Sequence, residues 1–328
     1  MSAPVLDERV DVTDALAALE RDGIVALPPL VSASRLTAMQ RAFATRLHRL
    51  RWNSSDGYER TELYRHMVED VLLLDQGFVD IALHPVVLAV ARAYVGPAFQ
   101  LTEAKGWKSL PTRKDFHGWH GDDWYDQATI TDIPREIKMA FYLTDVDTGA
   151  FNYALGSHRQ VHAHMLRQEE VGEVLSRSRV TVMTGKAGTA FLFDTSGIHR
   201  QGAPILHDRH ALFYSYRDPA IRLDPHIHAK NRYHPLLLNA AFLGNLTEEH
   251  QRVLGFGDTR HHAPAFARES GQTVLEALSR HGLAVKLRLD AWHGRIARRL
   301  RRLAQRTRAA RRPANASAPR PSREGGGS

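Results

Sequence analysis

The sequence of 328 residues contains no cysteine. Disulfide bonds, thiolate metal ligands, iron–sulfur clusters and cysteine nucleophiles are therefore excluded. Any metal ion must be bound by nitrogen and oxygen ligands, for which the chain offers 19 histidines and 36 acidic residues.

Lysine is also scarce, with seven copies against 37 arginines. Four of the seven lie around the segment 116–124, namely Lys105, Lys108, Lys114 and Lys138. They either serve an anionic substrate or co-substrate, or protect exposed strand edges from pairing with other chains. Edge protection is the favoured interpretation.

Long uncharged apolar runs are absent, and none approaches the roughly 20 residues of a membrane span. The N-terminus, MSAPVLDERVDVTD, is acidic and has no apolar signal core. We therefore expect a cytoplasmic protein.

The net charge of +8 is concentrated near the C-terminus. Between Lys286 and Arg312 there are eleven basic residues and one acid, so the rest of the chain is faintly acidic. Apolar residues recur there at spacings of three and four, which predicts a basic amphipathic helix over 284–312. It either packs on its own body or contacts an anionic membrane surface or a protein partner. Nucleic-acid binding is disfavoured because no base-reading motif accompanies it.

Helical spacing dominates before Pro97, and short strands follow it. Helices are predicted over 14–20, 36–47, 62–74, and from Pro85 to Tyr94, with a short strand over 23–27. Runs rich in β-branched and aromatic residues then alternate with turn sequences, at 99–110, 136–146, 150–155, 180–182, 189–194 and 210–216. This pattern predicts an antiparallel sandwich or barrel with a helical N-terminal part.

A metal motif lies in the segment 116–124, which reads Phe-His-Gly-Trp-His-Gly-Asp-Asp-Trp. On a strand, His120 and Asp122 would face the same side and offer an imidazole and a carboxylate to one ion. The best third ligand is His199, which follows the run 189–194. Two histidines and one carboxylate on one face of a metal leave three positions open, as in the facial triad of non-haem Fe(II) oxygenases.

Other histidines fit this metal site less well. His117 would pair with His120 only on a helix, so we place it near the ligands or at the substrate mouth. His158 is expected to tie a turn. A second metal site at Asp224, His226 and His228 is conceivable, but a surface or lid position is favoured.

Arg209 lies ten positions after His199 and begins a predicted strand. Its planar guanidinium matches a carboxylate in two-point contact. If the strand bearing His199 pairs with this one, Arg209 would hold the far carboxylate of an oxo-acid that chelates the metal. The alternative is a surface turn residue.

Together these residues resemble the phytanoyl-CoA dioxygenase family of Fe(II)/2-oxoglutarate-dependent oxygenases, over roughly residues 11–219. The resemblance is carried by an ordered series of segments: Glu20-Arg-Asp-Gly-Ile-Val-Ala-Leu27, His120-Gly-Asp122, Ile137-Lys-Met-Ala-Phe-Tyr-Leu-Thr-Asp-Val-Asp147, Gly156-Ser-His158-Arg, Gly188-Thr-Ala-Phe-Leu-Phe-Asp, His199 and Arg209. It implies a double-stranded β-helix, a cupin-like jelly roll, with helices packed outside.

The resemblance also assigns roles. His120, Asp122 and His199 carry over as iron ligands and catalytic residues, and Arg209 as the 2-oxoglutarate clamp. Residues expected to line the co-substrate pocket are Thr102, Lys138 and Gln201.

The implied reaction couples decarboxylation of 2-oxoglutarate to succinate and CO2 with oxidation of a small organic molecule by O2. Hydroxylation is the favoured outcome, with desaturation or ring formation as alternatives. Halogenating relatives lack the carboxylate that Asp122 supplies, so halogenation is disfavoured. We expect an oxygenase domain over 1–265, a basic helical extension over 266–312 and a disordered tail over 313–328.

Two other classes remain open from the residues alone. One is a non-catalytic jelly-roll binding protein that acts through its basic C-terminal helix. The other is a zinc or other divalent-metal hydrolase, which would have no use for Arg209.

Overall fold

The computed structural model describes most of the chain before residue 257. The described residues are 11–48, 64–69, 71–116, 118–122, 124–126, 132–159, 168–223, 236–256 and 265–266. The predicted basic helix and tail lie outside them, as do His117, Asp224, His226 and His228.

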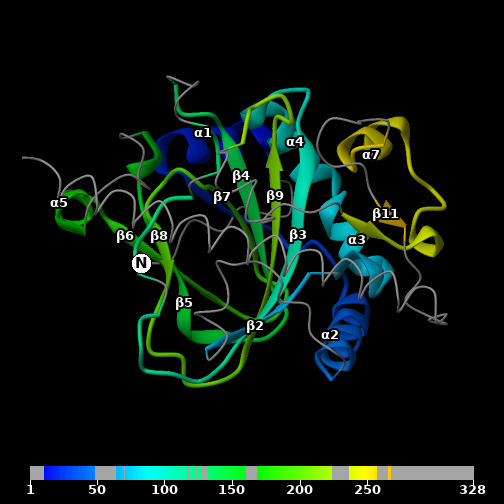
Figure 1. Ribbon diagram of the computed structural model, residues 1–328, viewed down its shortest axis with the longest axis horizontal. Coiled ribbons are helices and arrows are strands. Elements are labelled where there is room, and N and C mark those ends of the chain that lie inside the picture. The colour runs from blue at the N-terminus through cyan, green and yellow to red at the C-terminus, as the bar shows by residue number, and fades with distance from the viewer. Residues whose placement is uncertain are drawn as a thin grey trace, which may run out of the picture.

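Two facing antiparallel sheets form the core (Figure 1). The larger sheet has the order β1 (Ile24–Leu27), β7 (Ala190–Asp194), β4 (Glu136–Tyr142), β9 (Arg209–Arg217), β3 (Gln100–Ser109) and β2 (Arg65–Val68). The smaller sheet has the order β6 (Val180–Gly185), β5 (Val146–Ala154) and β8 (His199–Gln201). The antiparallel sandwich predicted from the alternating runs is confirmed, and the described strands form no closed barrel.

Helices cover the outer face of the larger sheet. They are α1 (Val12–Asp22), α2 (Ala33–Leu47), α3 (Gln76–Ala82) and α4 (Pro85–Val95). Ser32 caps α2, because its side chain accepts a hydrogen bond from the amide of Arg35. The hydroxyls of Tyr214 and Tyr216 on β9 donate to the carbonyls of Phe78 and Ala82, and so fasten α3 to the sheet.

The remaining described elements are short. They are α5 (Gln168–Arg177), α7 (Glu248–Val253), the 3-10 turns η2 (Val71–Leu73), η3 (Ser157–Arg159) and η5 (Ala240–Phe242), and the parallel pair β10 (Leu237–Leu238) and β11 (Ala265–Phe266).

Strand alternation assigns the side chains of β4 to two environments. Ile137, Met139 and Phe141 pack under the helices in the main apolar core. The alternate residues face the smaller sheet. Ala140 and Tyr142 pack between the sheets, and Glu136 and Lys138 lie on the same face. The larger sheet therefore presents charged side chains to the interior of the sandwich at one end.

The helix predicted over 62–74 is wrong. Arg65–Val68 form strand β2, which pairs with Gly106–Ser109 of β3, and Val71–Leu73 form a 3-10 turn. The apolar residues here have a spacing that suits a helix, but pairing with an open edge of β3 satisfies the backbone instead. Residues 62, 63 and 70 lie outside the described part of the chain.

The segment Gln76–Val95 is long and apolar enough to cross a membrane by length and composition alone. It is divided into α3 and α4, which meet at Leu83 and His84. Of its most apolar window, 56% is buried, and its side chains belong to the main core. Core packing accounts for its hydropathy.

Candidate metal centre

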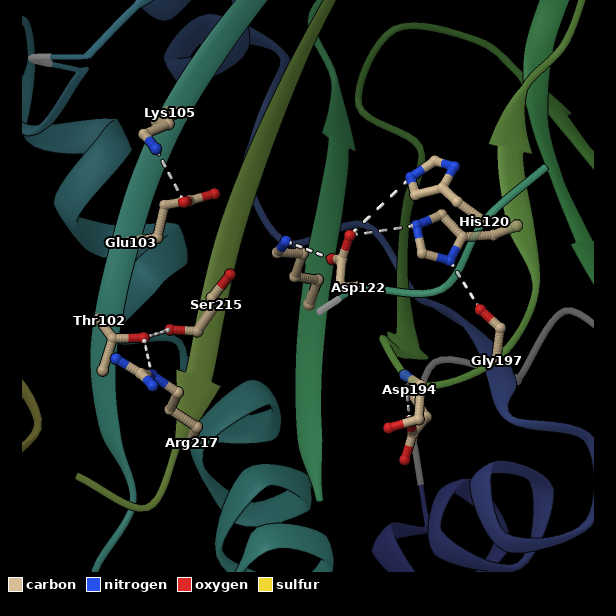
Figure 2. A network of polar contacts seen from close by, with 12 residues as sticks. Thr102, Glu103, Lys105, His120, Asp122, Asp194, Gly197, Ser215 and Arg217 are labelled. Carbon is tan, nitrogen blue, oxygen red and sulfur yellow. Dashed lines mark hydrogen bonds and ion pairs between the residues drawn. The ribbon is translucent and has the colours of Figure 1, made fainter. Parts of the chain in front are cut away.

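Three potential ligands converge between the sheets. His120 and Asp122 come from the segment after β3, and His199 begins β8. One ligand atom from each residue lies within 4.8 Å of the other two. Figure 2 shows the Asp122 carboxylate directed toward the imidazoles. The structure thus brings together the three residues that the sequence predicted.

The convergence depends on backbone pairing between distant segments. The amide of His120 donates to the carbonyl of His199 at 3.0 Å, and the amide of His199 donates back at 2.8 Å. This isolated bridge sets the two imidazoles 4.5 Å apart between ring centres. The amide of Asp122 donates to the carbonyl of Thr195, which holds the carboxylate in place. His120 and Asp122 therefore lie on a bridged loop and not on the continuous strand that their spacing suggested.

Each imidazole is oriented by a backbone carbonyl two residues earlier. Nδ1 of His120 lies 3.0 Å from the carbonyl of Gly118, and Nδ1 of His199 lies 2.8 Å from that of Gly197. Because these nitrogens donate, each Nε2 keeps its lone pair for a metal. The Nε2 atoms of His120 and His199 lie 3.8 and 3.9 Å from Oδ1 of Asp122.

Burial keeps both imidazoles neutral. It lowers the pKa of His199 to about 3, helped by the adjacent His120, and it also lowers the pKa of His120. Neutral imidazole is the form that binds a metal ion, so both rings are ready at neutral pH.

The Asp122 carboxylate has two separate tasks. Oδ1 faces the imidazoles, whereas Oδ2 accepts a hydrogen bond from Nζ of Lys138 at 2.6 Å. Burial alone would raise the pKa of Asp122, but Lys138 and both histidines bring it below its ordinary value. The carboxylate is therefore ionised and oriented while one oxygen remains available to an ion.

The donor set fits a single divalent iron. Two neutral nitrogens and one carboxylate oxygen match the facial triad, and no thiolate competes. The side chains of His120 and Asp122 are 28% and 23% exposed, against 7% for His199. The centre is therefore accessible from one side.

Two buried nitrogen atoms, one on Arg209 and one on Gln201, have no hydrogen-bond partner within the described ranges. Arg209 is 3% exposed; its Nη1 donates to the carbonyl of Gly149 at 2.7 Å, but its Nε has no hydrogen bond. Gln201 lies two residues beyond His199 on β8, and its Nε2 is also unpartnered. Ser109 connects them, because it is the register partner of Arg209 and its hydroxyl lies 3.3 Å from Oε1 of Gln201. Unpaired buried donors are costly, and an anionic carboxylate would satisfy both.

Arg209 reaches this position by a different route from the one expected. The strand that bears His199 pairs with β5 in the smaller sheet, whereas Arg209 begins β9 in the larger sheet. The two residues therefore approach from facing sheets, and the expected strand pairing is wrong. The surface-turn alternative is also wrong, because Arg209 is buried.

Thr102 and Lys138, the other residues expected to line the co-substrate pocket, bond residues other than Arg209 and Gln201. Thr102 accepts a hydrogen bond from Nε of Arg217 and donates to the carbonyl of Ser215. It is seven residues from Ser109 along β3, roughly 23 Å at the usual rise. Lys138 is bound to Asp122. The structure thus brings Gln201 into the neighbourhood of Arg209, but not Thr102.

Sequence reasoning missed a set of buried charges beside the centre. Lys105 is 1% exposed and pairs with Glu103 at 2.8 Å, so neither Lys105 nor Lys138 protects a strand edge. Burial opposes ionisation of Glu103, but Lys105 and Lys138 lower its pKa to about 2. The pattern Glu-x-Lys recurs in β3 and β4, at 103–105 and 136–138, but it does not by itself indicate burial.

A second buried arginine was missed as well. Arg65 on β2 is the register partner of Ser109, which places it in the same row as Arg209. Its guanidinium stacks 3.9 Å from the ring centre of Trp107. His158, in contrast, has the predicted structural role, since its Nε2 bonds the carbonyl of Glu20 at 3.2 Å.

Comparisons with known proteins agree with this geometry. The sequence pattern of the family described as Phytanoyl-CoA dioxygenase (PhyH) matches residues 19–204, which include the three candidate ligands but end before Arg209. No curated protein sequence gave a match.

Two solved structures resemble this fold. The non-haem alpha ketoglutarate dependent carbocyclase SnoK from nogalamycin biosynthesis matches with a TM-score of 0.53 at 18% identity, over 69% of this chain and 91% of SnoK. The epimerase SnoN, in complex with Fe3+, alpha ketoglutarate and nogalamycin RO, matches with a TM-score of 0.51 at 18% identity, over 78% of this chain and 96% of SnoN. At this identity the likeness shows the fold, a jelly roll.

The family match covers more than half of the 328 residues. The chain therefore belongs to the phytanoyl-CoA dioxygenase family of Fe(II)- and 2-oxoglutarate-dependent oxygenases.

Proposed function

We propose that this oxygenase binds one Fe(II) through His120, Asp122 and His199 and hydroxylates a C–H bond of a small organic molecule. The observation that carries the proposal is the convergence of three ligand atoms within 4.8 Å, with each imidazole fixed by a carbonyl at Nδ1. In this family the iron supplies activation of O2, coupled to decarboxylation of 2-oxoglutarate to succinate and CO2.

The protein supplies orientation and charge. Lys138 occupies Oδ2 of Asp122, so that Oδ1 stays directed toward the imidazoles. We place the far carboxylate of 2-oxoglutarate between Arg209 and Gln201, whose unpartnered Nε and Nε2 would both donate to it. Burial of Arg209 strengthens such a pair, because a charged hydrogen bond gains from a low local dielectric.

These donors favour an oxygenase over a metal hydrolase on the same scaffold. A hydrolase needs an ion and water but has no use for a buried guanidinium beside the site. The buried Nε of Arg209 and Nε2 of Gln201 call for an anionic partner, and a dicarboxylic co-substrate provides one.

The test is succinate release from 2-oxoglutarate in the presence of Fe(II) and O2. Asp122→Ala should reduce it to background, because a facial triad without its carboxylate loses its anionic ligand. The exposed Asp132 provides a matched control, and Asp132→Ala should keep the full rate. Full activity in Asp122→Ala, or activity under nitrogen without 2-oxoglutarate, would contradict the proposal.

A further inference from the structure

Glu136 is buried without a partner beside the proposed iron site. It is 1% exposed, and neither carboxylate oxygen has a hydrogen bond or ion pair among the described residues. A buried carboxylate that lacks partners is costly: burial raises the pKa of Glu136 to about 7, although Lys138 and Arg217 act to lower it, and a ligand, an ion or water that bonds the group would stabilise it.

The position of Glu136 links it to the metal ligands. The amide of Thr195 donates to the carbonyl of Glu136, and the carbonyl of Thr195 accepts from the amide of Asp122. Lys138, which holds Asp122, lies two residues further along the same face of β4. Glu136 is thus connected to Asp122 in two ways, each through one other residue: through the backbone of Thr195 and through Lys138 on the same strand face.

The cations nearest to Glu136 already have other partners. Lys138 bonds Asp122, and Lys105 bonds Glu103. Arg217, the register partner of Glu136, donates its Nε to Thr102, whereas its buried Nη1 has no hydrogen bond in the described part of the chain. In Figure 2, Glu103 and Lys105 on β3 and Ser215 and Arg217 on β9 lie on the same side of the ligands. Lys138 and Arg217 favour the ionised form of Glu136 electrostatically, but no hydrogen bond joins either of them to its carboxylate.

Other buried polar atoms on the neighbouring segments are also unpartnered. They are Oγ of Ser215 on β9, Oγ1 of Thr195 after β7, and Nε1 of Trp124, two residues beyond Asp122. Hydroxyls donate and accept, an indole nitrogen donates, and a carboxylate accepts. Such a mixed set matches hydroxyl or amino groups and does not suit a hydrocarbon chain.

Glu136 and Arg209 lie toward opposite ends of the sandwich. Along β9, Arg217 lies eight residues from Arg209, and Ser215, level with Lys138, lies between them. If 2-oxoglutarate occupies the Arg209 side, as proposed above, the Glu136 side is left for the substrate.

We infer that Glu136 binds a hydroxyl or ammonium group of the primary substrate, and that the substrate is a hydroxyl-rich, carbohydrate-like molecule and not an acyl chain. The inference rests on the proposed function, because it takes the two ends of the site as defined by iron and 2-oxoglutarate. Ser215, Thr195 and Trp124 supply the complementary donors and acceptors.

The experiment uses the full chain loaded with Zn(II), which is diamagnetic, and 2-oxoglutarate under nitrogen, so that binding is read without turnover. Saturation-transfer NMR compares glucosamine, glucose and octanoyl-CoA as probes. Glucosamine and glucose should bind, and Glu136→Gln should weaken glucosamine binding roughly tenfold, because a carboxylate accepts at both oxygens, whereas a carboxamide has one acceptor oxygen. The exposed Glu173→Gln is the matched control and should leave binding unchanged.

Each result has a defined meaning. Binding of octanoyl-CoA alone, or glucosamine affinity unchanged in Glu136→Gln, would overturn the inference and assign buried water to Glu136. Failure of glucosamine and glucose to bind the loaded protein would overturn it as well. Binding of 2-oxoglutarate, measured in the same samples, separates these outcomes from failure of the proposed function, and a normal unfolding midpoint for Glu136→Gln excludes misfolding.

Discussion

At the scale of single residues, the proposed iron site depends most on the Asp122 carboxylate. Its two oxygens face different partners, the imidazoles on one side and Lys138 on the other. A ligand held in this way needs little reorganisation to bind an ion, which is how groups outside the ligand set raise metal affinity.

Lys138→Met should therefore weaken Fe(II) binding by roughly tenfold to a hundredfold, the usual cost of losing a residue that orients a ligand. Anaerobic calorimetric titration measures the effect, and Lys138→Arg should restore most of the affinity. Lys186→Met removes an exposed lysine that pairs with Asp145 and should change nothing. Unchanged or tighter binding in Lys138→Met would show that Lys138 does not orient Asp122.

Arg209→Ala should raise the KM for 2-oxoglutarate. Loss of a charged hydrogen bond to a carboxylate costs about 2 kcal/mol, or roughly thirtyfold. The steady-state rate of succinate formation, measured against 2-oxoglutarate concentration, gives the KM. If the KM is unchanged, another group binds the far carboxylate, and Arg65, in the same row, is the first to examine.

The iron ligands and Arg209 were predictable because their residue types and order limit the chemistry strongly. Thr102 was placed beside Arg209 only by resemblance, and the strand register puts it at the other end of β3. Glu136 and Lys105 escaped notice because burial of a charge depends on which strand face meets the opposite sheet, and one sequence does not reveal that pairing.

At the scale of elements, α2 packs tightly on the sheet at Gly106 of β3. A Cβ added there would overlap the ring of Phe43 and lie 3.1 Å from Cγ1 of Val71. The glycine is required because the helix layer packs directly on the strand.

Gly106→Ala should destabilise the fold by about 1–3 kcal/mol through overpacking. Gly172→Ala is its counterpart, since a Cβ in α5 meets nothing within 4 Å. That substitution should stabilise the fold by about 0.5–1 kcal/mol, the helix preference for alanine over glycine. Urea unfolding of both variants measures the difference, and equal effects would contradict the packing account.

The elements were predictable where local signals are strong. Asp22-Gly23 marks the end of α1, and Gly23 has the left-handed φ of 79° that such an end requires. Pro85 marks the start of α4. The segment 62–74 was assigned wrongly because β2 owes its form to pairing with β3, which lies some 40 residues later in the chain.

At the scale of the whole molecule, His158 joins the N-terminal helix to the turn after β5. Burial lowers its pKa from 6.5 to about 4, although its bond to the carbonyl of Glu20 opposes this. The folded protein therefore resists a proton that the unfolded chain accepts below about pH 6.5. The resulting stability is complete above that pH and is lost as the pH falls toward 4.

His158→Gln should remove this dependence. Between about pH 7.5 and about pH 5, wild type should lose about 2 kcal/mol of unfolding free energy more than the variant. Urea unfolding at both pH values measures it. The comparison with the variant cancels other groups such as Asp194, whose burial raises its pKa to about 6 and acts in the opposite direction. Parallel pH profiles would contradict the assignment.

The fold class was predictable because short runs rich in β-branched and aromatic residues alternate with turn sequences, as they do in antiparallel sandwiches. The domain limits at 265 and 312, the membrane or partner contact of the basic helix and the cytoplasmic location stay predictions. The basic helix lies outside the described residues.

The central claim is that three side chains form one iron site. Anaerobic calorimetric titration with Fe(II) in the presence of 2-oxoglutarate tests it most directly. We predict one ion per chain for wild type and for Asp132→Ala, and no saturable binding for His120→Ala, Asp122→Ala or His199→Ala. Wild-type stoichiometry and affinity in any of these three variants would contradict the account.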